Sequence, residues 1–256
     1  ERQNAGIGYV RYRLGKAEDG SPQSICPAFT TEDVEMINAY EVVGSQKTDK
    51  SQSLYDEYIS ICARNGIEKN EMQRYMDYQT LTDFVISNTD EHLMNFGLLR
   101  DANSGKLLSP APIFDSGNSM FYTEEKRMTA FRRSELLEWE ITSFHSSEEK
   151  LLKHVKYRKI IKLDNLPDRQ EVLELYTSNG IPEAKVNMIA GSYENKLQMI
   201  HDFQIGKSIS LYHEKEREQK RIAELQKSIA ATEMGFGKEL DNTSLMHEQT
   251  QRRDIK

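Results

Sequence analysis

Three side chains with the chemistry to orient a hydroxyl and hold a divalent cation lie in the middle of the sequence. Asp90 and Asn95 are five residues apart with His92 between them, and Asp115 follows Asn95 by twenty residues. Transfer of a phosphoryl group needs a carboxylate that orients the attacking hydroxyl and oxygen ligands that hold Mg²⁺ against the phosphates. Mg²⁺ uses one or two carboxylates together with phosphate oxygens and water. The spacing indicates a phosphoryl-transfer site, with Asp90 as the orienting carboxylate and Asn95 and Asp115 as metal ligands.

The spacing of these residues is common by chance, but the elements around them support the phosphoryl-transfer interpretation. The loop with Asp90 follows a helical pattern and precedes an apolar run at residues 96–99. A turn pattern at residues 103–105 leads into a second apolar run, which ends at Asp115. We therefore predict two short strands joined by a hairpin, with the catalytic loop before them and the second Asp after them.

Each candidate residue also has a purely structural interpretation. Asp115 precedes Ser-Gly-Asn, and Asp side chains often bond their own backbone in such turns. His92 is the type of residue that more often holds a loop by hydrogen bonding than takes part in catalysis. Asn95 precedes Phe-Gly and could cap the loop. The catalytic interpretation depends on the joint pattern rather than on any single residue.

At these residues the chain resembles a known family, the HipA-like bacterial serine/threonine kinases, specifically their C-terminal kinase domain. The resemblance rests on N-T-D-x-H-x-x-N-F-G followed by S-P-x-x-x-x-D, over about residues 80–120. It implies a kinase-like fold, ATP with Mg²⁺, and phosphorylation of a protein hydroxyl. It also implies catalytic roles for Asp90, His92 and Asn95, with His92 near the γ-phosphate, and metal binding by Asn95 and Asp115. The Asp-x-His-x-x-Asn core is similar to that of phosphatidylinositol kinases too, so a small-molecule or lipid kinase stays open.

We expect an α+β, protein-kinase-like fold, with a mostly helical C-terminal lobe and a few N-terminal strands. The expected divisions are an N-terminal-lobe remnant and hinge (1–30), a helical kinase-like lobe (31–211), and a charged helix with a flexible tail (212–256). Alternating apolar and basic residues at 6–14 predict a strand, and residues 23–26 predict a second one. The resemblance implies that Ile25 and Cys26 belong to the hinge whose backbone meets the adenine of ATP.

The lysine that grips the α- and β-phosphates in kinases has no convincing counterpart. Gly6 and Gly8 precede a strand pattern and only faintly resemble a glycine-rich phosphate loop. The chain begins at Glu1 rather than at a methionine. We therefore expect either that the part of the site that binds the ATP phosphates lies upstream of Glu1, or that ATP binding is reduced. The missing lysine keeps a different class open, a non-catalytic kinase-like binding module of a toxin–antitoxin-type pair with an antitoxin-like protein partner.

Helical patterns surround the central motif. We predict helices at 53–64, from a cap at Asn70 to the loop, from 146, from 168 and from 182, and a charged helix at 212–231. The apolar stripe between Asn70 and the loop is expected to be core. Between Asp115 and the helix at 146, the basic residues Lys126, Arg127, Arg132 and Arg133 suggest either a phosphate- or substrate-binding segment or a solvated loop.

Composition excludes several classes of protein. The formal charge of -7 argues against a general electrostatic grip on nucleic acid. No apolar run approaches the roughly 18 residues of a membrane span, so no membrane partner is expected. Cys26 and Cys62 have neither metal-binding spacing nor a disulfide pattern, which favours a cytoplasmic location.

Overall fold

The computed structural model describes residue 3, residues 5–45 and residues 51–230. The chain divides into two units, Glu1–Ile209 and Ser210–Lys256. Within the first unit the described strands are β1 (Arg13–Lys16), β2 (Pro22–Ile25), β3 (Val34–Asn38), β4 (Gly97–Asp101) and β5 (Leu107–Pro110). The described helices are α1 (Ala39–Gly44), α2 (Leu54–Arg64), α3 (Lys69–Ile86), α4 (Arg133–Glu138), α5 (Glu148–Leu152), a 3₁₀ turn η1 (Leu163–Asn165), α6 (Arg169–Ser178) and α7 (Glu183–Gln204).

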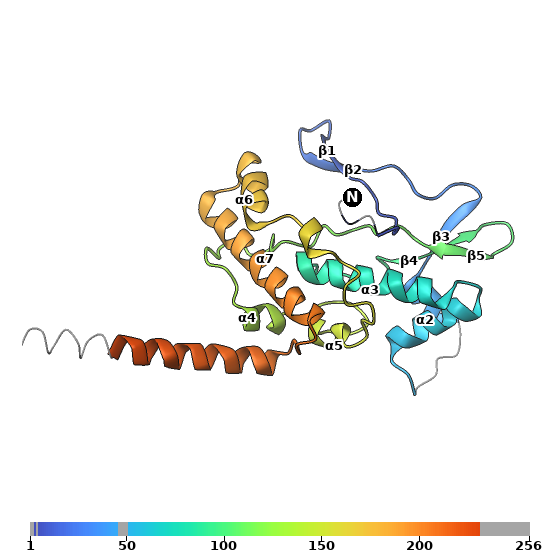
Figure 1. The fold of residues 1–256 in the computed structure, drawn as a ribbon. Helices are drawn as coiled ribbons and strands as arrows, with labels where there is room; N and C mark the ends of the chain where they lie inside the picture. Colours follow the sequence, from blue (N-terminus) through green and yellow to red (C-terminus); the bar gives the residue numbers. More distant parts are fainter. Residues whose placement is uncertain (1–2, 4, 46–50, 231–256) are drawn as a thin grey trace, which may run out of the picture. The chain divides into compact units, whose positions relative to one another are not determined.

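The predicted hairpin before Asp115 is present and belongs to a three-stranded antiparallel sheet of order β3-β4-β5 (Figure 1). Its turn is closed by Asp101, whose Oδ1 accepts the backbone N–H groups of Asn103 at 3.1 Å and Ser104 at 2.7 Å. This Asx-type turn explains why the chain reverses at this point. The β1–β2 hairpin forms a separate two-stranded sheet.

The strand predicted for residues 6–14 is largely wrong. Gly6 has φ +73, and regular pairing begins only at β1. The intervening residues instead join the chain just before Asp115, because Val10 N–H donates to Ile113 O and Ile113 N–H donates to Gly8 O, both at 2.8 Å. A long-range pairing therefore prevails over the local alternation. The second predicted strand is confirmed as β2, shifted by one residue.

Three predicted helix starts are confirmed. Helices α2 and α6 begin beside the predicted starts, where Ser53 and Asp168 are the caps, and α7 follows Pro182. The cap of α3 was predicted wrongly, because Glu68 rather than Asn70 accepts the first free backbone N–H, that of Glu71, at 2.7 Å. A carboxylate at a helix N-terminus also suits the positive end of the helix dipole.

The strand β3 and the helix α1 were not predicted. Their junction carries a sequence signal in Asn38 and Glu41, three residues apart, which form a capping box. Asn38 Oδ1 accepts Glu41 N–H at 2.8 Å, and the Glu41 side chain accepts Asn38 N–H at 3.4 Å. This box turns the chain directly from the sheet edge into a helix.

Helix α3 is the element on which the central loop depends. It packs against α2, α5 and α7 (Figure 1). The predicted apolar stripe is core: Met72, Tyr75, Met76, Leu81, Phe84 and Val85 are buried. A rigid buried helix thus ends one residue before the loop that carries Asp90.

Ion pairs occupy the predicted basic segment. Arg127 and Arg132 both pair with Glu135, at 2.9 and 3.2 Å, and Arg133 pairs with Asp202 at 2.9 Å. Arg127 also lies over the ring of Phe131, 3.9 Å from its centroid. These contacts hold α4 in place. They therefore favour a structural role for the three arginines over a phosphate-binding role.

In the second unit, residues 211–230 are helical, which confirms the predicted charged helix. The flexible tail predicted beyond it lies outside the described residues. Among the residues that the structure describes, no helix combines the length and apolar character required to cross a bilayer.

Candidate active site

The loop from Asn88 to Asn95 is built directly on the end of α3. Ser87 ends the helix in the left-handed conformation, with φ 52. Asn88 then returns to the helix: its backbone N–H donates to Asp83 O and its side-chain amide donates to Asp83 Oδ1, both at 2.9 Å. Asn88 Oδ1 in turn accepts the backbone N–H of Asp90 at 3.3 Å. A buried asparagine therefore fixes where the chain turns into Asp90.

Asp90 and Asn95 are joined by a hydrogen bond within the loop. Asn95 Nδ2 donates to the backbone carbonyl of Asp90 at 2.9 Å, and Asn95 N–H donates to His92 O at 2.8 Å. The nitrogen end of the Asn95 amide is thus used inside the loop, whereas its Oδ1 accepts no hydrogen bond from the residues that the structure describes. The carboxylate of Asp90 likewise has no described protein partner.

His92 closes the turn inside the loop. Its Nδ1 accepts the backbone N–H of Met94 at 3.3 Å, which requires a ring with Nδ1 unprotonated. This bond holds the imidazole within its own turn and agrees with the structural interpretation of the residue. It leaves Nε2 as the ring nitrogen that faces away from that turn.

Asp115 lies on the segment that follows β5, in the left-handed region with φ 54, and its side chain is exposed. Its backbone N–H donates to the hydroxyl of Tyr12 at 3.2 Å. Thr89 N–H donates to Asn118 O at 3.2 Å, and Met120 N–H donates to Ile86 O at 2.7 Å. The segment after Asp115 therefore lies along the start of the loop that carries Asp90 and Asn95.

The predicted hinge residues, Ile25 and Cys26, lie at the end of β2. Ile25 packs over Gly15 of β1, and Cys26 is an exposed free thiol. Three residues further on, Phe29 contacts the ring of Phe114 at a centroid distance of 5.4 Å. The chain after the predicted hinge thus meets the residue immediately before Asp115, although no described contact joins Ile25 or Cys26 to the central loop.

No group of three or more His, Cys, Asp and Glu side chains with metal-binding geometry occurs among the described residues. The amide oxygen of asparagine is a further ligand type outside that group. A site made from the carboxylates of Asp90 and Asp115 with the amide oxygen of Asn95 is a hard-oxygen donor set, which is the kind that Mg²⁺ prefers.

No family model matches the chain. The serine/threonine-protein kinase CtkA of Helicobacter pylori strain J99 is 29% identical over 100 residues. That match covers 38% of this chain and 30% of the relative, so the aligned part spans less than a third of the relative's length. The crystal structure of the Helicobacter pylori proinflammatory kinase CtkA matches with a TM-score of 0.51 and 14% identity, over 78% of this chain and 82% of that chain.

The fold resembles that of a protein kinase. The expected protein-kinase-like architecture is therefore supported in general terms, and the sequence match supports a kinase relationship over part of the chain.

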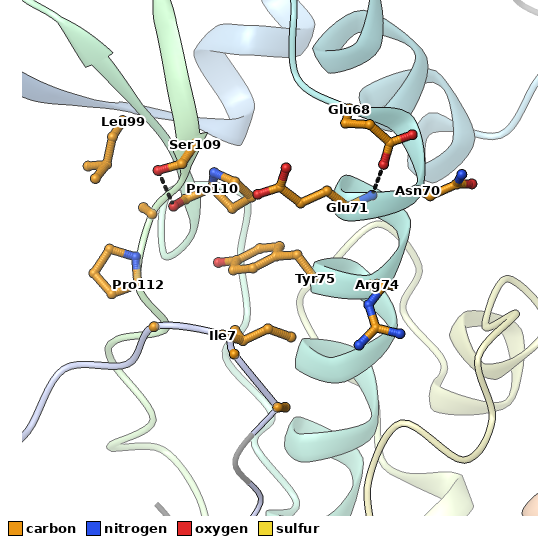
Figure 2. A pocket seen from close by; sticks show the side chains of 14 residues that line it. Ile7, Glu68, Asn70, Glu71, Arg74, Tyr75, Leu99, Ser109, Pro110 and Pro112 are labelled. Carbon is orange, nitrogen blue, oxygen red and sulfur yellow. Dashed lines mark hydrogen bonds between the residues drawn. The ribbon is translucent and has the colours of Figure 1, made fainter.

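Within this kinase-like fold, a cavity of about 520 Å³ lies between the chain before β1, the first turns of α3 and the end of β5 (Figure 2). Gly6 and Gly8 line it together with Arg74, Tyr75 and Pro112. Its lining does not include the residues predicted to carry the chemistry. The two glycines thus border a cavity of their own, and Gly8 packs closely on Pro112.

The residues that hold the loop were not predicted from the sequence. Asp83, Asn88 and Glu91 are buried, and Tyr12 binds the backbone of Asp115 across a separation of 103 residues. A signal existed for Asp83, because an acid lies inside the apolar stripe of α3 between Leu81 and Phe84. The contact made by Tyr12 has no local signal.

Proposed function

We propose that this chain is the kinase domain of a HipA-like serine/threonine protein kinase. It would transfer the γ-phosphoryl group of ATP to a protein hydroxyl with the help of Mg²⁺. The observation that carries the proposal is the order of elements: a loop with Asp90 bonded to Asn95, then an antiparallel hairpin, then Asp115. The partial resemblance to a serine/threonine kinase in sequence and fold also supports a kinase function.

The roles follow from the contacts of each side chain. Asp90 is the carboxylate that accepts or orients the proton of the attacking hydroxyl, and its backbone carbonyl is held by Asn95. Asn95 and Asp115 are the proposed metal ligands. His92 is a positioning residue of the loop, because its Nδ1 supports the turn at Met94.

The donor set fits Mg²⁺. The amide of Asn95 directs its nitrogen to Asp90 O and so leaves its oxygen as a ligand atom, and Asp115 presents an exposed carboxylate. When bound, Mg²⁺ would neutralise charge on the transferred phosphoryl group. The chain itself supplies orientation of the hydroxyl by Asp90 and two oxygen ligands at the ends of one hairpin.

We also propose roles for the three divisions of the chain. Residues 1–30 would belong to the N-terminal lobe, with Ile25 and Cys26 at the adenine, residues 31–211 would form the helical lobe, and residues 212–256 would form an appended segment. A cytoplasmic location is consistent with two free cysteines. An antitoxin-like protein partner stays a prediction.

Nucleotide binding provides the first test. A ligand at about a hundred times its dissociation constant adds roughly 2.7 kcal/mol to the free energy of unfolding, which is on the order of 5–10 °C in Tm for a domain of this size. We expect ATP with Mg²⁺ to produce such a shift in the wild-type chain, and Asp115→Ala to abolish the part that depends on Mg²⁺. An equal shift in Asp115→Ala, or a shift without Mg²⁺, would contradict the assignment of Asp115.

A further inference from the structure

Two buried carboxyl groups face each other beneath the central loop. Glu91 follows Asp90 directly and is 5% exposed, and Asp83 lies in the last turn of α3 and is 6% exposed. Both line a small cavity of about 10 Å³. A space of that size holds at most about one water molecule, so solvent cannot hydrate two ionised carboxylates there.

Hydrogen-bond donors are too few for two anions. Asp83 Oδ1 accepts from Asn88 Nδ2 at 2.9 Å, and Glu91 Oε2 accepts from Ser143 Oγ at 3.4 Å. The other two oxygens, Asp83 Oδ2 and Glu91 Oε1, are buried and make no hydrogen bond to a described protein group. The side chain of Gln79 is the other nearby donor, and it lowers the pKa of Glu91 less than burial raises it. An unpaired buried charge is very costly. One proton held between the two groups supplies the missing donor.

The neighbouring charged groups do not compensate the charge of two buried carboxylates. Glu148 on α5 faces Asp83, and Lys196 on α7 is committed to Glu148 at 2.5 Å. The hydroxyl groups of Tyr55 on α2 and Tyr75 on α3 are the other titratable groups near Glu91. The nearest cation therefore already has an anion of its own.

We propose that Glu91 is a positioning residue of the phosphotransfer site: its carboxyl group keeps its proton, donates it to Asp83, and so anchors the loop that presents Asp90. This role rests on the proposed function. Asp83 holds the loop on both sides of Asp90, through Asn88 two residues before it and through Glu91 one residue after it.

Electrostatics agree with this assignment. Burial raises the pKa of Glu91 well above its ordinary value, and the neighbouring charge of Asp83 raises it further. Because the folded chain then binds a proton that the unfolded chain has lost, the free energy of unfolding falls as the pH rises above the ordinary glutamate value. The loop anchor is accordingly strongest at acidic pH and weakens as the pH rises through the raised pKa of Glu91.

The test compares Glu91→Gln with wild type and Glu91→Ala. Glutamine has nearly the size of the protonated acid and donates an N–H to Asp83, but it does not titrate. We expect the wild-type Tm to fall with rising pH relative to that of Glu91→Gln, so that the difference between the two grows with pH. Asp83→Asn removes the charge that adds to the effect of burial on Glu91, so it should flatten the slope in part, and it serves if Glu91→Gln does not fold. A protonated carboxyl C=O band in the infrared spectrum of the wild type at neutral pH, absent in Glu91→Gln, is the third expected result.

Phosphotransfer kinetics distinguish a positioning role of Glu91 from a purely structural one. Glu91→Ala should lower kcat by about 10- to 100-fold, as loss of a supporting residue typically does, with the KM for ATP unchanged, and Glu91→Gln should restore kcat to near the wild-type value. Equal pH slopes in wild type and both neutral variants, or equal loss of kcat in Glu91→Gln and Glu91→Ala, would overturn the proposal. No transfer by the wild type would overturn the proposed function and the positioning role with it, whereas the pH-dependent Tm would still decide whether the proton is shared.

Discussion

The side-chain amide of Asn95 donates to the backbone carbonyl of Asp90 at 2.9 Å, so the two most diagnostic residues of the sequence motif contact each other. This bond fixes which end of the amide faces the site. The nitrogen is used inside the loop, and the oxygen is presented as a ligand atom.

An Asn95→Asp substitution tests that orientation. A carboxylate has no N–H to donate, and it would face the carbonyl oxygen of Asp90 with a negative charge. We expect phosphotransfer to fall by roughly 10²–10³-fold, the scale for loss of one preorganised electrostatic contact. Rates measured with labelled ATP at several Mg²⁺ concentrations check this, and Asn103→Asp, in the exposed hairpin turn, is the control. Unchanged transfer by Asn95→Asp would mean that the bond to Asp90 is dispensable.

The glycine of the N-F-G motif is required by the sheet. A Cβ at Gly97 would lie 2.1 Å from the carbonyl oxygen of Ile37 on β3, where neither backbone can move easily. We expect Gly97→Ala to cost about 1–3 kcal/mol in the free energy of unfolding, the usual range for overpacking. Gly44→Ala is the matched control, because nothing lies within 4 Å of its Cβ position. Denaturant unfolding of both variants measures the difference, and equal stabilities would contradict the close approach of β3.

The ion pair between Lys196 and Glu148 is almost fully buried, with Lys196 only 1% exposed. Lys196→Met leaves a buried carboxylate without its cation, so we expect a loss of about 3–5 kcal/mol. The double variant Lys196→Met, Glu148→Leu removes both charges and should recover most of that loss. Lys153→Met disrupts an exposed pair with Glu149 and should cost under about 1 kcal/mol. A double variant as unstable as Lys196→Met would show that the charges do not account for the loss.

From the histidine pair His145 and His154 we expect a second pH dependence of the free energy of unfolding, at acidic pH. His145 Nε2 lies 3.0 Å from His154 Nε2, which allows only one proton between them. Burial, followed by the neighbouring His154, lowers the pKa of His145. The unfolded chain therefore binds more protons, and stability that is present above about pH 6.5 is lost as the pH falls. Urea unfolding at pH 7.5 and 5.5 should show a smaller decrease for His145→Phe than for wild type. An equal decrease would exclude this pair as the source.

Local signals predicted much of the fold around the site. Ser53 and Asp168 bond the first turns of their helices, and the turn at Asp101 bonds its own backbone, so each pattern is decided within a few residues. The hairpin and the loop before it were predictable for the same reason.

The remaining features depend on distant contacts. Residues 8–10 were predicted as part of a strand but bond to Ile113, about a hundred residues away, and Tyr12 binds the backbone of Asp115. Lys196 occupies a core position of α7 only because Glu148 on α5 meets it. Periodicity along one segment carries no information about a partner on another, so these features became visible only in three dimensions.

Transfer of the γ-phosphoryl group from labelled ATP to protein, with Mg²⁺, tests the central claim most directly. The measurement compares wild type with Asp90→Ala, with the fold of both verified by circular dichroism, and it includes protein, lipid and small-molecule acceptors. We expect the wild type to label serine or threonine of a protein, and Asp90→Ala to transfer about 10²–10⁴-fold more slowly, the range for loss of a general base. Undiminished labelling by a folded Asp90→Ala, or labelling of lipid or small molecules alone, would contradict the account.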